Sequence, residues 1–319
     1  MKFQNLPKKL KLIQKVTEMS QEELARKLDV SFVTLNSWIN AKSTPRDKHK
    51  KAIEELYRVY FEKDINESAA FDSVKAKKSF ILKESSKRNN LQHILKNPDI
   101  YEELLLQVTY NTNSIEGSTL TKADTAAVLF ENKSLPGKNL IEHLEAKNHQ
   151  TAFKYLFDWL DESGAKQTIN EQLISKLHLL LMHGILDNAG NYRAHPVRIV
   201  GSNVPTANSL KVPELMEDLV AEINSESADV IAKVARIHSK FEQIHPFSDG
   251  NGRLGRLLII AMLLRENIAP AVVQQDQKQE YLDALNKSQL KEDHGLLEDF
   301  ICDSIIFGIK ILNRNTLVS

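Results

Sequence analysis

The sequence contains a single cysteine, Cys302, and no long apolar segment. One thiol excludes an intramolecular disulfide framework and a cysteine-based zinc site. The longest strongly apolar run, 257–264, is far shorter than the roughly 20 residues that span a bilayer. The first residues lack the apolar stretch of a secretory signal, so we expect a cytoplasmic protein with no membrane partner.

The chain also has no excess of charge, because 42 basic side chains balance 42 acidic ones. No overall field therefore points to nucleic acid or membranes. The charges are nevertheless unevenly placed. Residues 1–60 hold thirteen Lys and Arg against seven Asp and Glu, a net charge of +6, and the remainder therefore carries −6. This asymmetry predicts two parts with different partners.

The composition is that of a folded protein, with 42% hydrophobic and 26% charged residues in a chain of 319. Apolar residues recur at helical spacing almost throughout, which predicts an all-α fold. Thr168 and Glu171 predict a capping box at one of the helix starts. Beyond residue 90 the expected helices cover 100–110, 122–130, 140–160, 171–186, 212–223, 230–244, 254–266 and 279–285.

Two short helices near the N-terminus are separated by a tight turn. Ser20 and Glu23 form a capping-box pair at the start of the first helix, and Ser31 opens the second. Leu24 lies on the apolar stripe of the first helix, and we assign Trp38 to the core. This outline is typical of a helix-turn-helix.

One stretch departs from helical spacing. Within residues 192–203, Val197 and Ile199 alternate with polar residues ahead of Gly201. Alternation of this kind next to a glycine predicts a short β-hairpin between helices.

Phosphate-binding features gather in residues 245–256, HPFSDGNGRLGR. Gly250 and Gly252 allow backbone N–H groups to converge on one spot at a helix start, which makes an anion site. Arg253 and Arg256 lie three residues apart on that helix and share a face, so both can bind further phosphate oxygens.

The same stretch supplies an acid and a base. Asp249 offers a hard oxygen ligand for Mg²⁺ beside the phosphates. His245 has a pKa suited to accepting a proton near neutral pH. The alternative is a glycine-rich turn with a core histidine, but four kinds of catalytic group in one short window favour a nucleotide-handling loop.

Residues 245–256 resemble the signature of the Fic family, H-x-F-x-(D/E)-G-N-G-R-x-x-R, and Asn251 completes the match at every specified position. The resemblance implies a helical domain that transfers AMP from Mg·ATP to a Ser, Thr or Tyr hydroxyl of a target protein. It implies that His245 deprotonates this hydroxyl, which attacks the α-phosphate while pyrophosphate leaves.

The resemblance also assigns the remaining positions of the loop. Asp249 would hold Mg²⁺, Gly250–Gly252 would cradle the phosphates, and Arg253 and Arg256 would bind the β and γ phosphates. Phosphorylating members of the family carry Lys where this chain has Gly252, so transfer of AMP is favoured.

Two further stretches are similar to the family. Residues 191–202 resemble a flap that docks the target by strand pairing, with Val200 and Gly201 in its second half.

Residues 112–117, TNSIEG, resemble an inhibitory helix whose glutamate, here Glu116, pairs with the second motif arginine, Arg256. The alternative for Glu116 is an acidic residue beside a turn, near a helix N-cap. Residues 134–156 resemble a class in which the same glutamate assists removal of AMP.

On the adenine side the resemblance points to Tyr281, within YLDAL, as a residue that stacks near the base. Leu282 stands where the family often has a second tyrosine.

His178 and His183 are five residues apart and do not share a helix face, and His238 is interpreted as a packed histidine. We therefore expect no metal other than Mg²⁺.

Residues 20–46 resemble the helix-turn-helix of Cro/repressor-type regulators. That docking mode places the second helix in the major groove of DNA. The alternative is a module used only for dimerisation. The residues implied in DNA binding are Gln21, Ser31, Phe32, Thr34 and Ser37.

Together these features predict an all-α protein in which a small helix-turn-helix domain precedes a Fic-type helical bundle with a short β-hairpin flap. The expected function is an autoinhibited protein adenylyltransferase that uses ATP and Mg²⁺, possesses self-modifying capacity and forms a homodimer. The alternatives are removal of AMP at the same site, or a DNA-binding regulator that senses nucleotide.

The expected parts of the chain are 1–60 (helix-turn-helix), 61–90 (linker), 91–150 (inhibitory region) and 151–319 (catalytic core).

Overall fold

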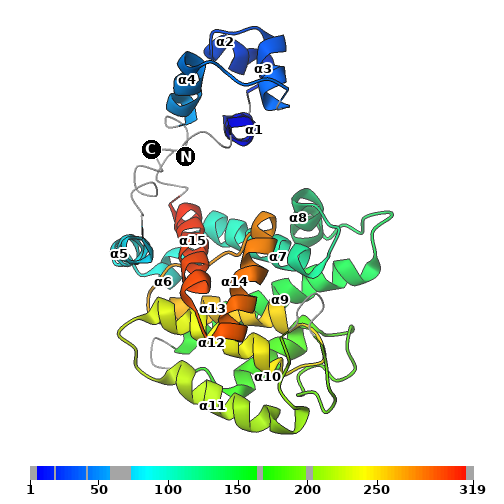
Figure 1. Ribbon diagram of the computed structural model, residues 1–319. Coiled ribbons are helices and arrows are strands. Elements are labelled where there is room, and N and C mark those ends of the chain that lie inside the picture. Colours follow the sequence, from blue (N-terminus) through cyan, green and yellow to red (C-terminus); the bar gives the residue numbers. More distant parts are fainter. Residues whose placement is uncertain are drawn as a thin grey trace. The chain divides into compact units, whose positions relative to one another are not determined.

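The protein is described by a computed structural model that covers residues 6–17, 19–40, 42–57, 73–163, 168–198 and 204–313. The chain divides into two compact units, residues 1–77 and 78–319, whose helices are labelled in Figure 1. Helix is the only regular secondary structure in the described ranges, which confirms the all-α prediction. None of the helices in those ranges is both long enough and apolar enough to cross a membrane.

The described residues of the first unit form four helices around a small apolar core. Leu10, Leu24, Leu35, Trp38 and Ile53 are all buried there, as expected for Leu24 and Trp38. The helices are α1 (Leu6–Thr17), α2 (Gln21–Lys27), α3 (Phe32–Ile39) and α4 (Asp47–Tyr57).

The start of α2 confirms the predicted capping box. The Ser20 hydroxyl accepts a hydrogen bond from the N–H of Glu23 at 3.2 Å, and the Glu23 carboxylate accepts one from the N–H of Ser20 at 2.8 Å. Two backbone donors that the helix leaves open are thereby satisfied. Ser31 caps α3 in the same manner, accepting from the N–H of Thr34 at 3.2 Å.

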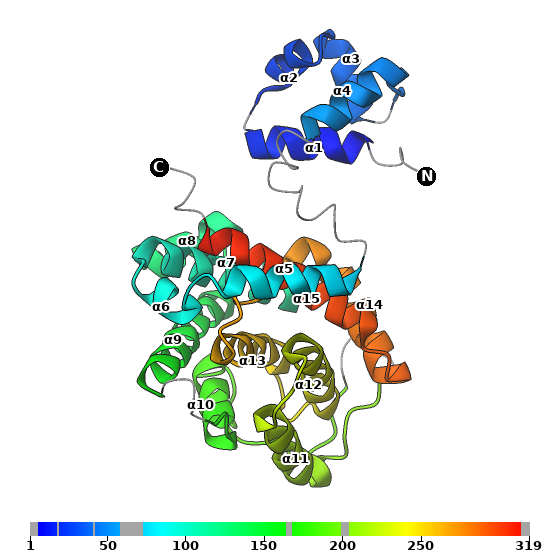
Figure 2. The ribbon, with the colours of Figure 1, turned by 90° about the vertical axis from the view of Figure 1, so that its left-hand side faces the viewer.

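The second unit is a bundle in which α13 is the central helix. All but two of the residues of α13 are buried, which is the pattern of a helix surrounded by others. It packs against α7, α9, α10 and α12, and Figure 2 shows it between α9 and α12. The helices of this bundle are α5 (Val74–Ser85), α6 (Asn90–Leu95), α7 (Pro98–Glu116), α8 (Lys122–Glu131), α9 (Leu140–Ser163), α10 (Glu171–Leu181), α11 (Val212–Asn224), α12 (Val230–Ile244), α13 (Asn251–Arg265), α14 (Lys278–Lys291) and α15 (Gly295–Leu312).

Part of the expected linker 61–90 belongs to this bundle. Ser85, at the end of α5, accepts a hydrogen bond from the N–H of Ala269 at 3.1 Å. The carboxamide of Asn90 donates to the carbonyl oxygen of Asn267 at 2.6 Å. These buried polar contacts fix the α5–α6 turn to the segment that follows α13.

The predicted β-hairpin is not found in the described part of 192–203. Residues 192–198 and 204–208 contain no strand. Their backbone is held instead by the buried guanidinium of Arg193, which donates to the carbonyl oxygens of His245 at 2.7 Å, His195 at 2.8 Å and Ala207 at 2.6 Å. Hydrogen bonds from the Arg193 guanidinium to backbone carbonyls therefore hold this segment, in place of the hydrogen bonds that would join the two strands of a hairpin. Val200 and Gly201 lie outside the described residues.

The predicted capping box of Thr168 and Glu171 is wrong. Helix α10 is capped by Asn170, whose side-chain oxygen accepts from the N–H of Leu173 at 2.9 Å. Asparagine is the stronger cap and stands directly before the helix. The Glu171 carboxylate instead accepts a hydrogen bond from the Tyr192 hydroxyl at 2.7 Å.

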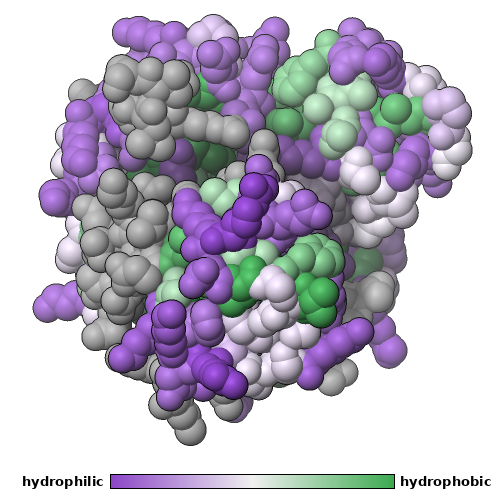
Figure 3. All heavy atoms as spheres, turned by 90° about the horizontal axis from the view of Figure 1, so that it is seen from above, coloured by the Kyte–Doolittle hydropathy of each residue, from purple (hydrophilic) through white to green (hydrophobic). Residues whose placement is uncertain are grey.

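On the face shown in Figure 3, hydrophilic side chains are interleaved with small apolar patches. The most exposed large apolar side chains of the described residues are Val33, Leu140 and Leu210. Val33 and Leu210 are ordinary for a folded protein, whereas Leu140 lies next to Ile141, which is 41% exposed.

Candidate active site

The loop 245–250 joins the end of α12 to the start of α13. Its two ends have left-handed backbone conformations, with φ of 50° at His245 and 76° at Gly250. A Cβ on Gly250 would also meet the Met182 sulfur at 2.6 Å, so glycine is required there both for its conformation and for space. The turn brings the base at one end of the loop close to the helix start at the other.

Asn251 closes this loop. Its side-chain oxygen accepts from the N–H of Phe247 and its amide donates to the carbonyl of Phe247, both at 2.9 Å. One carboxamide thus satisfies both backbone groups of a buried residue, which neither a carboxylate nor an apolar side chain can do. The side chain of Asn251 is therefore structural, and only its backbone N–H is left for the expected phosphate cradle.

His178 supports the loop from α10, a role that the sequence did not reveal. Its ring stacks on Phe247 with centroids 3.7 Å apart and an angle of 9° between the planes. Nδ1 accepts from the N–H of Gly190 at 2.8 Å, which leaves Nε2–H to donate to the carbonyl oxygen of Asp249 at 2.9 Å. Burial lowers the pKa of His178 to about 4, so the ring is neutral, as this pair of bonds requires.

His245 is placed to act as a base through Nε2. Its Nδ1 lies 3.2 Å from the carbonyl oxygen of Glu242, and this bond assigns the proton to Nδ1. Burial lowers the pKa of His245 below its usual value, outweighing the hydrogen bond to Glu242 that raises it. The imidazole is therefore neutral at pH 7, with a lone pair on Nε2.

The second arginine of the loop, Arg256, forms the expected pair with Glu116. Its Nη2–H donates to the Glu116 carboxylate, and its Nε–H donates to the Thr112 hydroxyl at 2.6 Å. Burial opposes ionisation of Glu116, but the charge and hydrogen bond of Arg256 prevail and hold the pKa of the carboxyl below its usual value. The two charges therefore persist as an ion pair, in which the Arg256 side chain is buried and the Glu116 side chain is partly exposed.

Glu116 is the last residue of α7, and Gly117 follows it as a left-handed C-cap with φ of 110°. The alternative of an N-cap acid is therefore wrong. A carboxylate at a helix C-terminus is disfavoured by the helix dipole, so helix stability does not explain this residue. A Cβ on Gly252 would overlap Glu116 Oε1, so the carboxylate lies directly over the glycine of the anion cradle.

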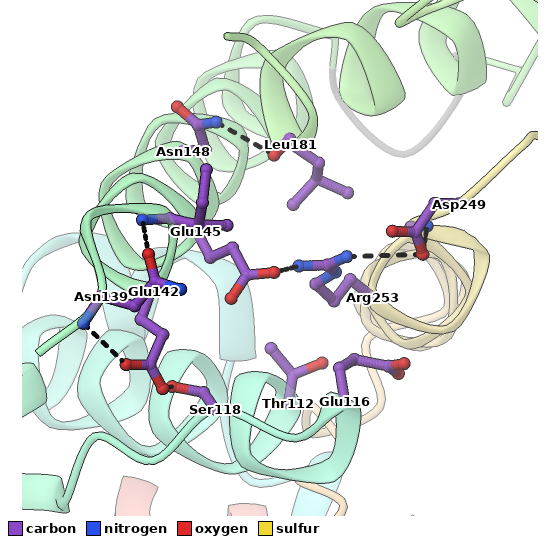
Figure 4. A network of polar contacts seen from close by, with 12 residues as sticks. Thr112, Glu116, Ser118, Asn139, Glu142, Glu145, Asn148, Leu181, Asp249 and Arg253 are labelled. Atoms are coloured by element: carbon purple, nitrogen blue, oxygen red, sulfur yellow. Dashed lines mark hydrogen bonds and ion pairs between the residues drawn. The ribbon is translucent and has the colours of Figure 1, made fainter. Parts of the chain in front are cut away.

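The first arginine of the loop, Arg253, lies between two carboxylates, as Figure 4 shows. Its Nη1 is 2.5 Å from Glu145 Oε1 on α9, and its Nη2 is 3.7 Å from Asp249 Oδ1. The sequence did not point to Glu145, which is 108 residues away from its partner.

Asp249 is the one loop carboxylate open to solvent, with a side chain 62% exposed. Its Oδ1 accepts from the N–H of Gly250 at 2.6 Å. No group of three or more His, Cys, Asp or Glu side chains converges on a metal site among the described residues. One exposed carboxylate fits Mg²⁺ that arrives on a triphosphate, since Mg²⁺ then takes most ligands from phosphate and water.

The position of Tyr281 does not fit a base-stacking role. Its side chain is 2% exposed, and its hydroxyl bonds to His238 Nε2 at 2.7 Å. The ring also packs against Phe300, with centroids 5.5 Å apart. A nucleotide base could reach Tyr281 only if this core opened, so the tyrosine serves packing here.

Glu242 is a second buried carboxyl that the sequence did not single out. Burial raises its pKa to about 8, and its Oε1 has no hydrogen-bond partner. Gly255 of α13 makes room for it, because a Cβ there would meet Glu242 Oε1 at 2.5 Å. The carboxyl is therefore neutral at pH 7, directly beneath the loop.

Of the residues expected to contact DNA, Ser31, Phe32 and Thr34 lie at the start of α3, Ser37 lies in its second half, and Gln21 opens α2. Ser31 and Phe32 are exposed, and the ring of Phe32 is 46% accessible. Ser37 is hydrogen-bonded to Ser43 at 2.5 Å, and Gln21 accepts from Asn36 at 3.0 Å. The Phe32 side chain is therefore free to face a partner, whereas Ser31 caps α3, and Ser37 and Gln21 are hydrogen-bonded within the domain.

Residues 168–263, which include the whole loop, match the Fic/DOC family, and residues 18–63 match a helix-turn-helix family. The chain therefore carries a Fic/DOC domain and a helix-turn-helix domain.

Relatives with curated names extend this similarity. The chain is 32% identical over 203 residues to the protein adenylyltransferase Fic of Nematostella vectensis, covering 63% of this chain and 46% of that protein. It is 31% identical over 217 residues to the protein adenylyltransferase fic-1 of Caenorhabditis elegans, covering 63% and 40%. The chain thus spans less than half the length of these two relatives.

Solved structures show the same fold at lower identity. A Fic domain-containing signaling protein from Bacteroides thetaiotaomicron has a TM-score of 0.65 at 21% identity, covering 76% of this chain and 98% of that one. A variant of Fic-1 from C. elegans has a TM-score of 0.66 at 21% identity, covering 98% and 89%.

Proposed function

We propose that this protein transfers AMP from ATP to a Ser, Thr or Tyr hydroxyl of a target protein. The observation that carries the proposal is the loop geometry, in which residues 245–250 begin at a neutral His245 with a free Nε2 and end at a helix start that can bind phosphates. The curated names of the relatives support the same reaction. Gly252, where phosphorylating members have lysine, favours AMP as the group transferred.

The chemistry then follows from the placement of the groups. His245 Nε2 takes the proton of the target hydroxyl, and the oxygen forms a bond to the α-phosphorus as the bond to pyrophosphate breaks. Backbone N–H groups at the start of α13, together with Arg253, stabilise the charge of the leaving pyrophosphate. Mg²⁺, carried by the nucleotide and held by Asp249, would neutralise further phosphate charge.

We propose further that Glu116 holds the site inactive. The guanidinium of Arg256 gives one N–H edge to Glu116 and its Nε–H to Thr112, so the donors that a γ-phosphate needs are in use. The carboxylate over Gly252 also places a negative charge where the triphosphate would lie. Both effects disfavour productive binding of ATP.

The test is transfer of label from ATP in the presence of Mg²⁺. Glu116→Gly should raise labelling of proteins in a lysate, or of the protein itself, by about tenfold or more, since a charged competitor of the phosphate is removed. Glu116→Gln, which keeps the shape but not the charge, should give an intermediate rate. His245→Ala in the Glu116→Gly background should abolish transfer. Mass spectrometry should find AMP adducts, and their absence from the Glu116→Gly reaction would exclude the proposal.

One observation favours the reverse reaction as a second activity. The Glu116 side chain remains 33% exposed while it pairs with Arg256, so an ionised oxygen can face water. A carboxylate in this position could orient a water molecule toward an AMP-modified hydroxyl. The test is release of AMP from a modified target by the wild type and not by Glu116→Gln.

DNA binding by the first unit, a homodimer and a cytoplasmic location also remain proposals. The net charge of +6 over residues 1–60 and the exposed start of α3 support DNA binding.

Neighbouring Leu140 and Ile141, both exposed on α9, are a surface that a second copy could cover. Light scattering of the wild type and of Leu140→Asp would test the dimer.

A further inference from the structure

Two carboxylates compete for one guanidinium beside the catalytic loop (Figure 4). Glu145 Oε1 is 2.5 Å from Arg253 Nη1, whereas Asp249 Oδ1 is 3.7 Å from Arg253 Nη2. Glu145 comes from α9, and Asp249 precedes Arg253 by one helical turn.

The difference in burial between the two carboxylates explains why Arg253 pairs more closely with Glu145 than with Asp249. The side chain of Arg253 is 4% exposed, that of Glu145 is 17% exposed, and that of Asp249 is 62% exposed. Opposite charges attract more strongly where water is excluded, so the guanidinium is drawn to the inner carboxylate. Its Nε is buried with no hydrogen-bond partner, which makes the bond to Glu145 its main anchor.

Glu145 can hold Arg253 in place because hydrogen bonds one turn before it and one turn after it fix the position of α9. One turn earlier, Glu142 accepts a hydrogen bond from the N–H of Thr119, just beyond α7. One turn later, Asn148 donates to the carbonyl oxygens of Leu181 at 3.1 Å and His183 at 2.7 Å, at the end of α10. Residues 142, 145 and 148 are spaced by three and share a helix face, so Glu145 is held in register with both neighbours.

We propose that Glu145 is a positioning residue that keeps Arg253 away from Asp249. With Glu145 in place, Arg253 Nη2 stays 3.7 Å from Asp249 Oδ1, and the exposed Asp249 carboxylate is accessible to the Mg²⁺ that accompanies ATP. Without it, the guanidinium turns toward Asp249, and the incoming metal ion has to displace a cation from its own ligand. This inference rests on the proposed nucleotide-transfer function.

The proposal is tested by binding of Mn²⁺ with a non-hydrolysable ATP analogue, followed by electron paramagnetic resonance of free Mn²⁺. The parent protein is Glu116→Gly, in which Arg256 is released. Adding Glu145→Gln should raise the Mn²⁺ concentration for half-saturation about tenfold, the effect expected from one lost charge-assisted contact. The Mg²⁺ needed for half-maximal AMP transfer should rise in parallel, while kcat at saturating Mg²⁺ changes much less.

Glu222→Gln is the matched control. Glu222 is 21% exposed and pairs with Arg236 and Lys240, each at 2.6 Å, so it is similar to Glu145 in burial and bond length but does not contact a loop arginine. It should leave the metal requirement unchanged. In an Arg253→Gln background, Glu145→Gln should have no further effect on Mn²⁺ binding, because the residue acts through that guanidinium.

Circular dichroism and thermal melting establish that each variant is folded. If Glu145→Gln does not fold, Glu145→Asp keeps the charge, shortens the reach and should give a smaller shift in the same direction. An unchanged or lower Mn²⁺ requirement in the folded variant overturns the proposal, and a lower one would make Glu145 a competitor of phosphate. A parent that fails to bind the Mn²⁺–analogue pair overturns the proposed function instead.

Discussion

At His245, the position of one proton decides whether the loop can take a proton from a hydroxyl. The bond from Nδ1–H to the Glu242 carbonyl leaves the lone pair on Nε2, and burial lowers the pKa of the ring. The base is active when neutral, so activity is lost as pH falls through this lowered pKa.

We therefore predict that kcat/KM for AMP transfer by Glu116→Gly stays level from about pH 8 down to pH 7. The acid limb should have its midpoint below 6.5, the ordinary value for histidine. Initial rates across this pH range measure it, with circular dichroism to show that the protein remains folded. A midpoint at or above 6.5 would contradict the buried neutral imidazole.

Glu242 gives a second residue-scale prediction, this one on stability. Its folded pKa of about 8 exceeds the ordinary 4.5, so between these values the folded state holds a proton that the unfolded state has lost. The contribution to stability is therefore complete below pH 4.5 and declines as pH rises toward 8. The slope is about 1.4 kcal/mol per pH unit at most.

Glu242→Gln removes this titration, and its free energy of unfolding should vary less between pH 6 and about pH 8 than that of the wild type. Denaturant melts at both pH values measure the difference. Glu222→Gln, which changes a partly buried ion pair, should keep the wild-type slope. An equal slope in Glu242→Gln would show that the carboxyl is ionised in the folded protein.

The residues of the loop itself were predictable because the whole group is contiguous in sequence. Its supports were not. His178 is 71 residues from the carbonyl that it holds, and Glu145 is 108 residues from Arg253. Such partners are brought together only by tertiary packing, and a single histidine or glutamate on a helix carries no local signal of it. The pairing of Glu116 with Arg256 was found only because a second short motif marked it.

At the scale of elements, α12 was predicted closely and α15 was missed. Helix α12 has the predicted bounds of 230–244, because its apolar residues recur at helical spacing. Helix α15 (Gly295–Leu312) was not predicted, although 11 of its 18 residues are buried. The predicted hairpin was not found in the described residues. Alternation of apolar and polar residues over a few positions also occurs in irregular backbone that a side chain such as Arg193 holds.

Close packing of α15 makes one glycine of that helix critical. A Cβ on Gly308 would overlap the carbonyl oxygen of Pro270, a backbone atom that cannot move aside alone. Gly308→Ala should therefore lower the free energy of unfolding by about 1–3 kcal/mol, despite the better helix propensity of alanine. Urea denaturation measures it.

Gly295→Ala on the same helix is the control. The nearest neighbour of a Cβ there is Asp293 Oδ1 at 3.4 Å, an ordinary contact, so stability should be unchanged or slightly raised. Equal effects of the two substitutions would mean that α15 does not pack on Pro270 as described.

For the whole molecule, the charge asymmetry and the division into two units coincide. The basic residues 1–60 lie within the first unit, 1–77, and the acidic remainder includes the nucleotide loop. The sequence could predict two parts because composition changes between them. It could not predict the boundary closely, because residues 85–90 look like a polar linker and yet bind the segment after α13.

This division leads to a prediction about DNA. The full chain should bind duplex DNA with an affinity that falls steeply with salt, the logarithm of the binding constant changing by about 0.9 for each phosphate contact per logarithmic unit of salt. Phe32→Ala removes an exposed apolar ring at the start of α3, where contact with thymine methyl groups is typical. It should reduce enrichment of preferred sequences from a random duplex pool while leaving the salt slope unchanged, since the ring touches no phosphate.

Fluorescence anisotropy over a salt series measures the salt slope, and sequencing of the bound duplex pool measures the preference. His245→Ala is the control because its change lies in the other unit. If the wild type shows no salt-sensitive binding, the helix-turn-helix serves contacts between proteins, and the positive charge of residues 1–60 requires an acidic partner of another kind. If Phe32→Ala changes the salt slope and not the preference, α3 lies along the phosphates and another element reads the bases.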